Sequence, residues 1–201
     1  EHDQKSMISH IRDLMRSGDR SSALSSMEAE VQDLEALEAE TALIYGLLLY
    51  LEGKCDRARP YLEQGVKAEP QSPEWASDQA LALAFLGRPD VGAAVLQRVC
   101  GEDQATSVDY GRLGGIFMML GQLDAAEAAF VEAIEREPGR AEWHSNIGGI
   151  RARQFRLDEA LEQYEKALSL NPTNTKTQNL RDQMLIALDK PQDLVTEREK
   201  R

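Results

Sequence analysis

The chain has 201 residues, of which 42% are hydrophobic, 29% charged and only 5% aromatic, and its formal net charge at pH 7 is −12. This composition suits an ordered protein built on Ala- and Leu-rich helix packing better than a β-sandwich. The negative balance excludes the usual nucleic-acid-binding class, because binding a phosphate backbone requires a cationic surface that releases counterions.

The N-terminal segment carries a loose helical pattern. Leu14, Gly18, Ala23 and Met27 fit it with one residue of slippage, so residues 1–38 are expected to form a degenerate helix pair. No Gly or Pro occurs between Ser22 and Tyr45, which leaves one long acidic helix open as an alternative. We favour two helices.

The next four units, 39–72, 73–106, 107–140 and 141–174, follow a period of 34 residues. In the last two, Leu113-Gly114, Ala126, Phe130, Ala133 and Pro138 recur as Ile147-Gly148, Ala160, Tyr164, Ala167 and Pro172. The first has Tyr45-Gly46, Ala58, Leu62, Val66 and Pro70, and the second, degenerate unit has Ala80, Gly92, Leu96 and Val99, with Gln104 in place of the closing Pro. A fixed period of this length indicates stacked helix pairs.

The spacing inside a unit is helical. Leu157, Ala160, Leu161, Tyr164, Ala167 and Leu168 place apolar side chains on one helix face. Recurring Gly and Ala let helix backbones approach, while Phe130 and Tyr164 fill the space between units. Ser72-Pro73 predicts a helix start, and Pro138 and Pro172 predict helix ends.

Residues 175–201 begin like another first helix and then stop within the unit. They are expected to form a C-terminal capping helix or a truncated further repeat. The truncated reading implies a piece of a longer repeat protein, and the capping reading a polar end that solvates the array. Both interpretations stay open.

The repeat pattern resembles the tetratricopeptide repeat (TPR), with its Leu-Gly pair, small Ala positions and closing Pro. The resemblance implies an all-α, right-handed superhelical solenoid of antiparallel helix pairs, whose first helices line a concave groove for a peptide or partner helix. Carried over by position, the groove residues are Leu43, Ile44, Leu47, Tyr50 and Leu51, then Ser77, Asp78, Leu81 and Phe85, then Arg112, Gly115, Met118 and Met119, then Asn146, Gly149 and Arg153.

This set is apolar in its first half and mixed in its second. TPR cochaperones that clamp acidic C-termini use Lys, Asn and Arg on three first helices, and Leu43, Leu47, Ser77 and Leu81 stand where much of that clamp is needed, which disfavours it. Met118 and Met119 suit an adaptable apolar surface, although inter-repeat packing is the simpler role for one of them. Alternatively, an N-terminal helix around Ile8, Ile11 and Leu14 already covers the apolar half.

Catalytic and metal-binding patterns are absent from the sequence. The glycines of residues 111–115 follow no strand and are expected to serve helix contact rather than a phosphate loop. His144 has no nucleophile to pair with, and Cys55 and Cys100 are expected to be free thiols without metal-ligand spacing. Arg151, Arg153 and Arg156 form one basic cluster, read as a solvated helix end or, alternatively, an anion contact.

We therefore expect a non-enzymatic adaptor of bacterial type, without cofactor or metal, that binds a protein or peptide partner. The alternative is the TPR module of a larger protein, such as a sulfotransferase, glycosyltransferase, methyltransferase or envelope polysaccharide-export protein. Self-association through the terminal repeats is a third expectation. The sequence contains no apolar run long enough to cross a bilayer, so the chain is not expected to be integral to a membrane, and the sequence favours neither the cytoplasm nor the periplasm.

Overall fold

The computed structural model describes residues 2–30 and 37–188, whereas residues 1, 31–36 and 189–201, including the end of the expected last unit, lie outside the description. The described residues form eleven helices and no strand, which confirms the all-α fold. The helices are α1 (His2–Ser17), α2 (Arg20–Glu30), α3 (Ala39–Leu51), α4 (Cys55–Gly65), α5 (Pro73–Phe85), α6 (Pro89–Cys100), α7 (Ser107–Met119), α8 (Leu123–Arg136), α9 (Ala141–Arg153), α10 (Leu157–Leu170) and α11 (Thr175–Ala187).

The helix starts follow the repeat period. The first helices α3, α5, α7, α9 and α11 begin at residues 39, 73, 107, 141 and 175, which are the first residues of the expected units. The helix α2 is described as far as Glu30, and residues 37–38 are non-helical before α3 begins at Ala39. A non-helical stretch therefore precedes α3 in the described part, and two helices in the N-terminal segment stay a prediction.

Local chemistry explains several helix ends. Ser72 caps α5 by accepting a hydrogen bond from the backbone N–H of Trp75, with Pro73 at the first helical position, as predicted. Thr106 and Asp109 form a reciprocal capping box at the start of α7. The helices α8 and α10 end two residues before Pro138 and Pro172, because proline cannot continue a helix.

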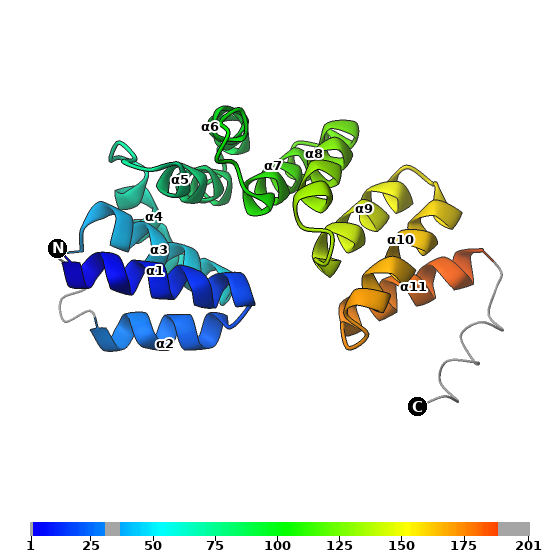
Figure 1. Cartoon of the computed structure of the whole chain (residues 1–201), viewed down its shortest axis with the longest axis horizontal. Helices are drawn as coiled ribbons and strands as arrows, with labels where there is room; N and C mark the ends of the chain where they lie inside the picture. Colours follow the sequence, from blue (N-terminus) through cyan, green and yellow to red (C-terminus); the bar gives the residue numbers. More distant parts are fainter. Residues whose placement is uncertain (1, 31–36, 189–201) are drawn as a thin grey trace. The chain divides into compact units, whose positions relative to one another are not determined.

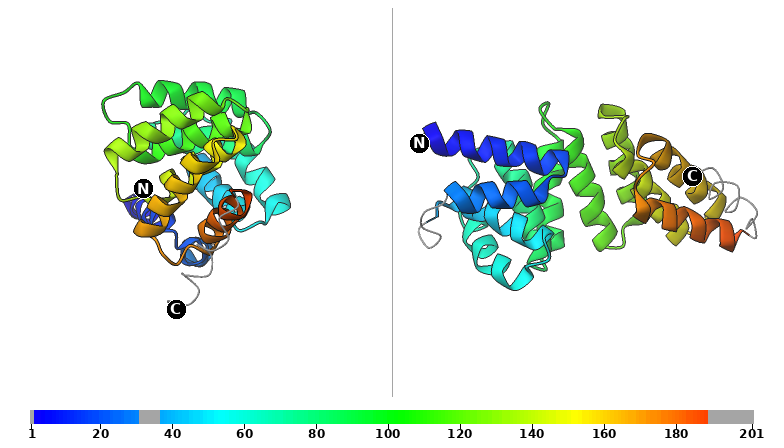
Figure 2. Two further views of the ribbon diagram at one scale, coloured as in Figure 1. Left: turned by 90° about the vertical axis from the view of Figure 1, so that its right-hand side faces the viewer. Right: turned by 90° about the horizontal axis from the view of Figure 1, so that it is seen from below.

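The chain divides into two compact units, Glu1–Val99 (unit 1) and Cys100–Arg201 (unit 2). In unit 1, buried side chains of α1, α2, α3 and α4 form one core that includes Ile11, Met27, Leu43 and Leu62. In unit 2, α7 lies beside α8 and α9 beside α10 as antiparallel neighbours (Figures 1 and 2).

Glycines set the distance between these neighbours in unit 2. A Cβ on Gly114 would lie 2.9 Å from the Phe130 ring, and a Cβ on Gly148 would lie 2.7 Å from the Tyr164 ring. Both rings are buried. The predicted role of the recurring glycines in close helix contact is thus confirmed, and Gly111, packed on Trp143, serves in the same way.

Candidate functional site

The predicted groove residues of α3 lie inside unit 1. Leu43, Ile44 and Leu47 are at most 1% exposed and belong to the core. The sequence of α3 is apolar around its whole circumference apart from its first turn, and such a helix must be covered on every side. A partner has no access to these three side chains while the unit keeps this arrangement.

The ends of α3 and α5 bring two predicted residues together. Tyr50 and Phe85 stack with their ring centroids 3.9 Å apart and their planes 10° from parallel. Both rings are half-buried, as are Leu51 and Leu81. Offset or stacked aromatic pairs add to the stability of a packed interface, so these residues are held in place rather than free to adapt.

Asp78 on α5 is nearly buried, with 4% of its surface exposed. Its carboxylate accepts hydrogen bonds from Arg12 on α1, at 2.7 Å from Nη2 and 3.0 Å from Nε. Arg12 also donates to Glu40 on α3 over 2.9 Å. Burial alone disfavours the charged guanidinium, but Asp78 and Glu40 outweigh it, so the pKa of Arg12 is raised.

The helix α1 thus covers the apolar half of the predicted groove. Ile8 and Ile11 are buried in the same core cluster as Leu43 and Leu47, and Leu14 packs against that cluster. The alternative interpretation, in which an N-terminal helix occupies this face, is confirmed. Binding by the predicted residues of α3 and α5 stays a prediction, and it requires α1 to move.

In unit 2 the predicted residues remain accessible. Arg112, Met118 and Asn146 are half-buried, Arg153 is exposed, and Met119 is 56% exposed. Arg112 and Asn146 are separated by one repeat period, as are Met119 and Arg153, so α7 and α9 present equivalent positions. Gly115, between them on α7, has open space where a Cβ would stand. We call this set, with Gly149, the α7–α9 face.

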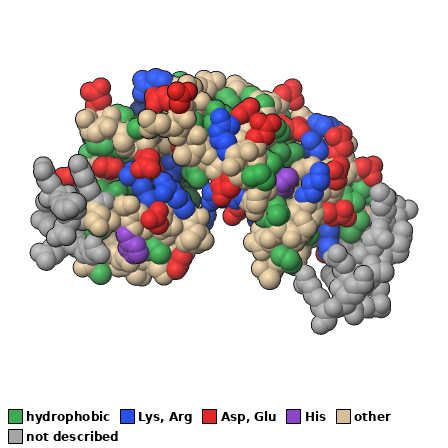
Figure 3. Space-filling view, in the orientation of Figure 1, with side chains coloured by type: hydrophobic (Ala, Val, Ile, Leu, Met, Phe, Trp, Pro, Cys, Tyr) green, Lys and Arg blue, Asp and Glu red, His purple; other side chains and the backbone are tan. Residues whose placement is uncertain are grey.

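The basic cluster next to this face is engaged in ion pairs. Arg151 donates to Glu127 over 2.8 Å, and Arg156 donates to the other oxygen of the same carboxylate over 3.2 Å. Arg156 also pairs with Glu159, which lowers the pKa of that carboxyl, first through their hydrogen bond. Two of the three arginines therefore link α8, α9 and α10, and acidic and basic side chains are interspersed on the surface in Figure 3.

Three further residues were considered for chemical roles: His144, Cys55 and Cys100. His144 contacts the side-chain oxygen of Gln163 through Nδ1 at 3.0 Å. Cys55 and Cys100 are free thiols, as predicted. Among the described residues, no cluster of His, Cys, Asp and Glu has the makings of a metal site. No helix in the described ranges combines the length and apolar character needed to cross a membrane.

Two noteworthy residues were missed from the sequence. Arg12 was not singled out, because a lone Arg in an amphipathic helix carries no signal of its carboxylate partners. Phe155 was also missed, although the period gives a signal: it stands one repeat after Gly121, at the position where the other units have Gly87 and Gly53. Its ring is 88% exposed and its φ is +61°, the only positive φ of a non-glycine residue within the described part.

Tandem helix pairs with buried aromatic rings against small residues define a helical repeat protein. The tetratricopeptide repeat family model matches residues 46–106 and 113–175. The chain therefore belongs to the tetratricopeptide repeat family. No curated protein sequence matches the chain significantly.

Solved structures share this fold. The MamA structure labelled AMB-1 is 25% identical with a TM-score of 0.56, covering 84% of this chain and 96% of MamA. YrrB, described as a TPR protein with an unusual peptide-binding site, is 20% identical with a TM-score of 0.58, covering 88% and 90% of the two chains. PilW, described as a widely conserved type IV pilus biogenesis factor, is 18% identical with a TM-score of 0.72, covering 96% and 89%.

Proposed function

We propose that this protein is a non-enzymatic interaction scaffold that binds a peptide or helix of a partner protein on the α7–α9 face. The observation that carries the proposal is the contrast in burial between the two units. The first helix α3 of unit 1 is enclosed from Thr41 to Leu49, whereas α7 and α9 keep one face accessible, with Met119 more than half exposed.

The chemistry of the α7–α9 face suits an extended or helical segment. Met118 and Met119 offer flexible thioethers that adapt to different apolar side chains. Arg112 and Arg153 bring positive charge to a chain with a net charge of −12, so they favour a segment with carboxylates. Gly115 and Gly149 leave room for close approach to the helix backbone. The peptide-binding site named in the description of YrrB is consistent with this use of the fold.

The test begins with peptides selected on the intact chain from a displayed library, whose affinities are then measured by fluorescence anisotropy. We expect Met119→Asp to weaken binding at least tenfold, which corresponds to about 1.4 kcal/mol. Val131→Asp is the matched control, since Val131 is an exposed apolar residue on the second helix α8. Equal losses in both variants, or no loss in the Met119 variant, would rule out the α7–α9 face.

A further inference from the structure

The helix α1 covers the face that α3 and α5 present in unit 1. The helix α1 is amphipathic: Ile8 and Ile11 are buried against the core, whereas Ser9, His10 and Asp13 point to solvent. Because α3 is apolar around its circumference, losing α1 would expose large aliphatic side chains to water, at a cost of roughly 25 cal/mol per Å². The face therefore requires an apolar helix on it at all times.

The same face also requires a positive charge. Three carboxylates from two helices surround the Arg12 guanidinium: Asp78 at 2.7 Å, Glu40 at 2.9 Å and Glu74 at 3.7 Å. The side chain of Arg12 is 12% exposed and that of Asp78 is 5% exposed. A nearly buried carboxylate without a cation is strongly unfavourable, so an occupant without a basic residue at this point would not fit.

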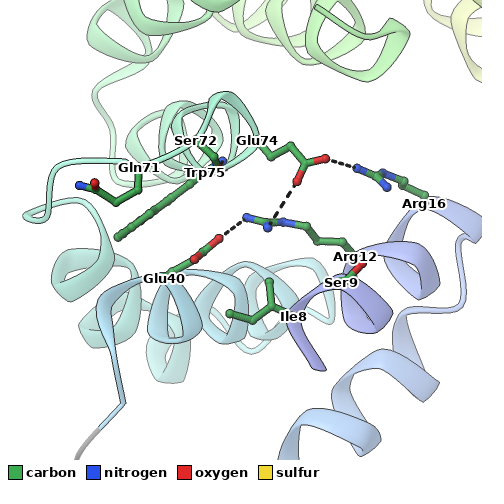
Figure 4. A pocket seen from close by; sticks show the side chains of 9 residues that line it. All are labelled: Ile8, Ser9, Arg12, Arg16, Glu40, Gln71, Ser72, Glu74 and Trp75. Atoms are coloured by element: carbon green, nitrogen blue, oxygen red, sulfur yellow. Dashed lines mark hydrogen bonds and ion pairs between the residues drawn. The ribbon is translucent and has the colours of Figure 1, made fainter. Parts of the chain in front are cut away.

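Figure 4 shows the arrangement. Arg12 reaches from α1 between Glu40 of α3 and Glu74 of α5, and Arg16 pairs with the outer side of Glu74 over 3.1 Å. A cavity of about 300 Å³ opens beside these ion pairs, with Trp75 along one wall. The indole Nε1 of Trp75 is buried without a hydrogen-bond partner. The contact of α1 with this face is therefore incomplete at its edge.

We propose that the α3–α5 face is a second docking surface, specific for an amphipathic helix that carries one Arg beside aliphatic side chains, and that α1 is its resident intramolecular occupant. An incoming helix of that chemistry replaces each contact that α1 gives up. The free energy of the exchange is then the difference between the binding free energies of two similar helices, and the full cost of exposing the face does not enter. The proposal concerns a different face from the one assigned above and stands independently of it.

The probe is a fluorescent peptide with the sequence of residues 2–17, and the receptor is the intact chain. In the wild-type chain the resident α1 competes and binding is weak. Arg12→Glu in the chain places a fourth carboxylate beside the other three, so it should weaken the docking of α1 while every residue of α3 and α5 stays as in the wild type. We expect the peptide to bind this variant at least tenfold more tightly than the wild-type chain.

Two controls make the result specific. A peptide carrying the same Arg12→Glu change should not bind the variant chain, because it lacks the required cation. A chain with Arg16→Glu, in which the altered residue is 48% exposed at the rim, should behave like the wild type. Met119→Asp should leave binding of the α1 peptide unchanged, which separates this proposal from that for the α7–α9 face.

Should Arg12→Glu abolish the cooperative unfolding transition of the chain, Arg12→Gln replaces it, since it removes the ion pairs without adding repulsion. The proposal is overturned by either of two results: no peptide binding to an Arg12 variant that still unfolds cooperatively, or equal binding of the two peptides to that variant.

Discussion

Phe155 occupies the position that Gly121 occupies one repeat earlier, and both have a left-handed backbone, with φ of +61° and +72°. Glycine adopts this conformation freely, whereas an L side chain is strained there by roughly 1–2 kcal/mol. The Phe155 ring gains nothing from packing in return, because it is exposed. The turn between α9 and α10 is therefore strained, whereas the equivalent turns of the earlier repeats have glycine at this position and are not.

Replacing Phe155 by Gly should therefore stabilise the protein. We expect Phe155→Gly to increase the free energy of unfolding by about 1 kcal/mol, because relief of strain exceeds the greater entropy of glycine in the unfolded chain. Chemical denaturation measures the change. Gly121→Ala is the matched control and should destabilise by a similar amount, since only backbone strain opposes a Cβ there. A loss of stability in Phe155→Gly would contradict the expectation.

Two adjacent glycines on α7 should respond oppositely to the same substitution. A Cβ at Gly114 would meet the buried Phe130 ring at 2.9 Å, so we expect Gly114→Ala to destabilise the protein by about 1–3 kcal/mol through overpacking. Gly115 has open space around it, and Gly115→Ala should stabilise the helix by up to about 1 kcal/mol. Thermal unfolding of both variants tests the pair, and the same sign of change in both would argue against this packing.

The 34-residue period predicted the contacts between glycines and aromatic rings well. The positions of Gly114, Gly148, Phe130 and Tyr164 follow from one spacing, because the two helices of each of these repeats meet through the same contact between a glycine and an aromatic ring. Helix starts were predictable for the same reason, aided by local caps such as Ser72. These features depend on residues within about one repeat of each other.

The candidate site was less predictable, because its contacts join residues whose separation does not follow the 34-residue repeat. Position in the repeat placed Leu47 and Asp78 on an open face, but Arg12 lies 66 residues before Asp78 and belongs to a degenerate pair. No local signal links such residues. The sequence did offer the covering helix as an alternative, since Ile8, Ile11 and Leu14 share one face. In contrast, Met119 and Arg153 are exposed, and their part in binding stays a prediction.

Glu127 on α8 should be a sensitive point of unit 2. Its carboxylate accepts hydrogen bonds from Arg151 and Arg156, and its side chain is only 18% exposed. We expect Glu127→Gln to lower the free energy of unfolding by about 2 kcal/mol, because charge-assisted hydrogen bonds contribute more than neutral ones. Glu162→Gln is the control: its pair with Lys166 is largely exposed and should be worth less than about 1 kcal/mol. Equal losses of unfolding free energy for the two variants in urea denaturation would show that the Glu127 network stabilises the protein no more than an exposed ion pair does.

The two thiols should differ in reactivity. Burial, followed by the nearby Asp109 charge, raises the pKa of Cys100 to about 12 from 9.0, with Arg136 opposing. Alkylation proceeds through the thiolate. At pH 8 the fraction of Cys100 present as thiolate should therefore be about 1000-fold lower than that of a thiol of ordinary pKa. Cys55, in contrast, is exposed. Iodoacetamide labelling of Cys55→Ser and Cys100→Ser variants, followed by mass spectrometry, should show slow modification of Cys100 and fast modification of Cys55.

The same shift fixes the sign of a pH effect on stability. The folded chain holds the Cys100 proton more tightly than the unfolded chain, so its contribution to stability is complete below pH 9 and is lost as the pH rises toward about 12. Cys100→Ser removes this group, and its stability should fall less steeply than that of the wild type between pH 9 and 11. Identical slopes, or equal labelling rates for the two thiols, would show that Cys100 is not protected in the folded chain.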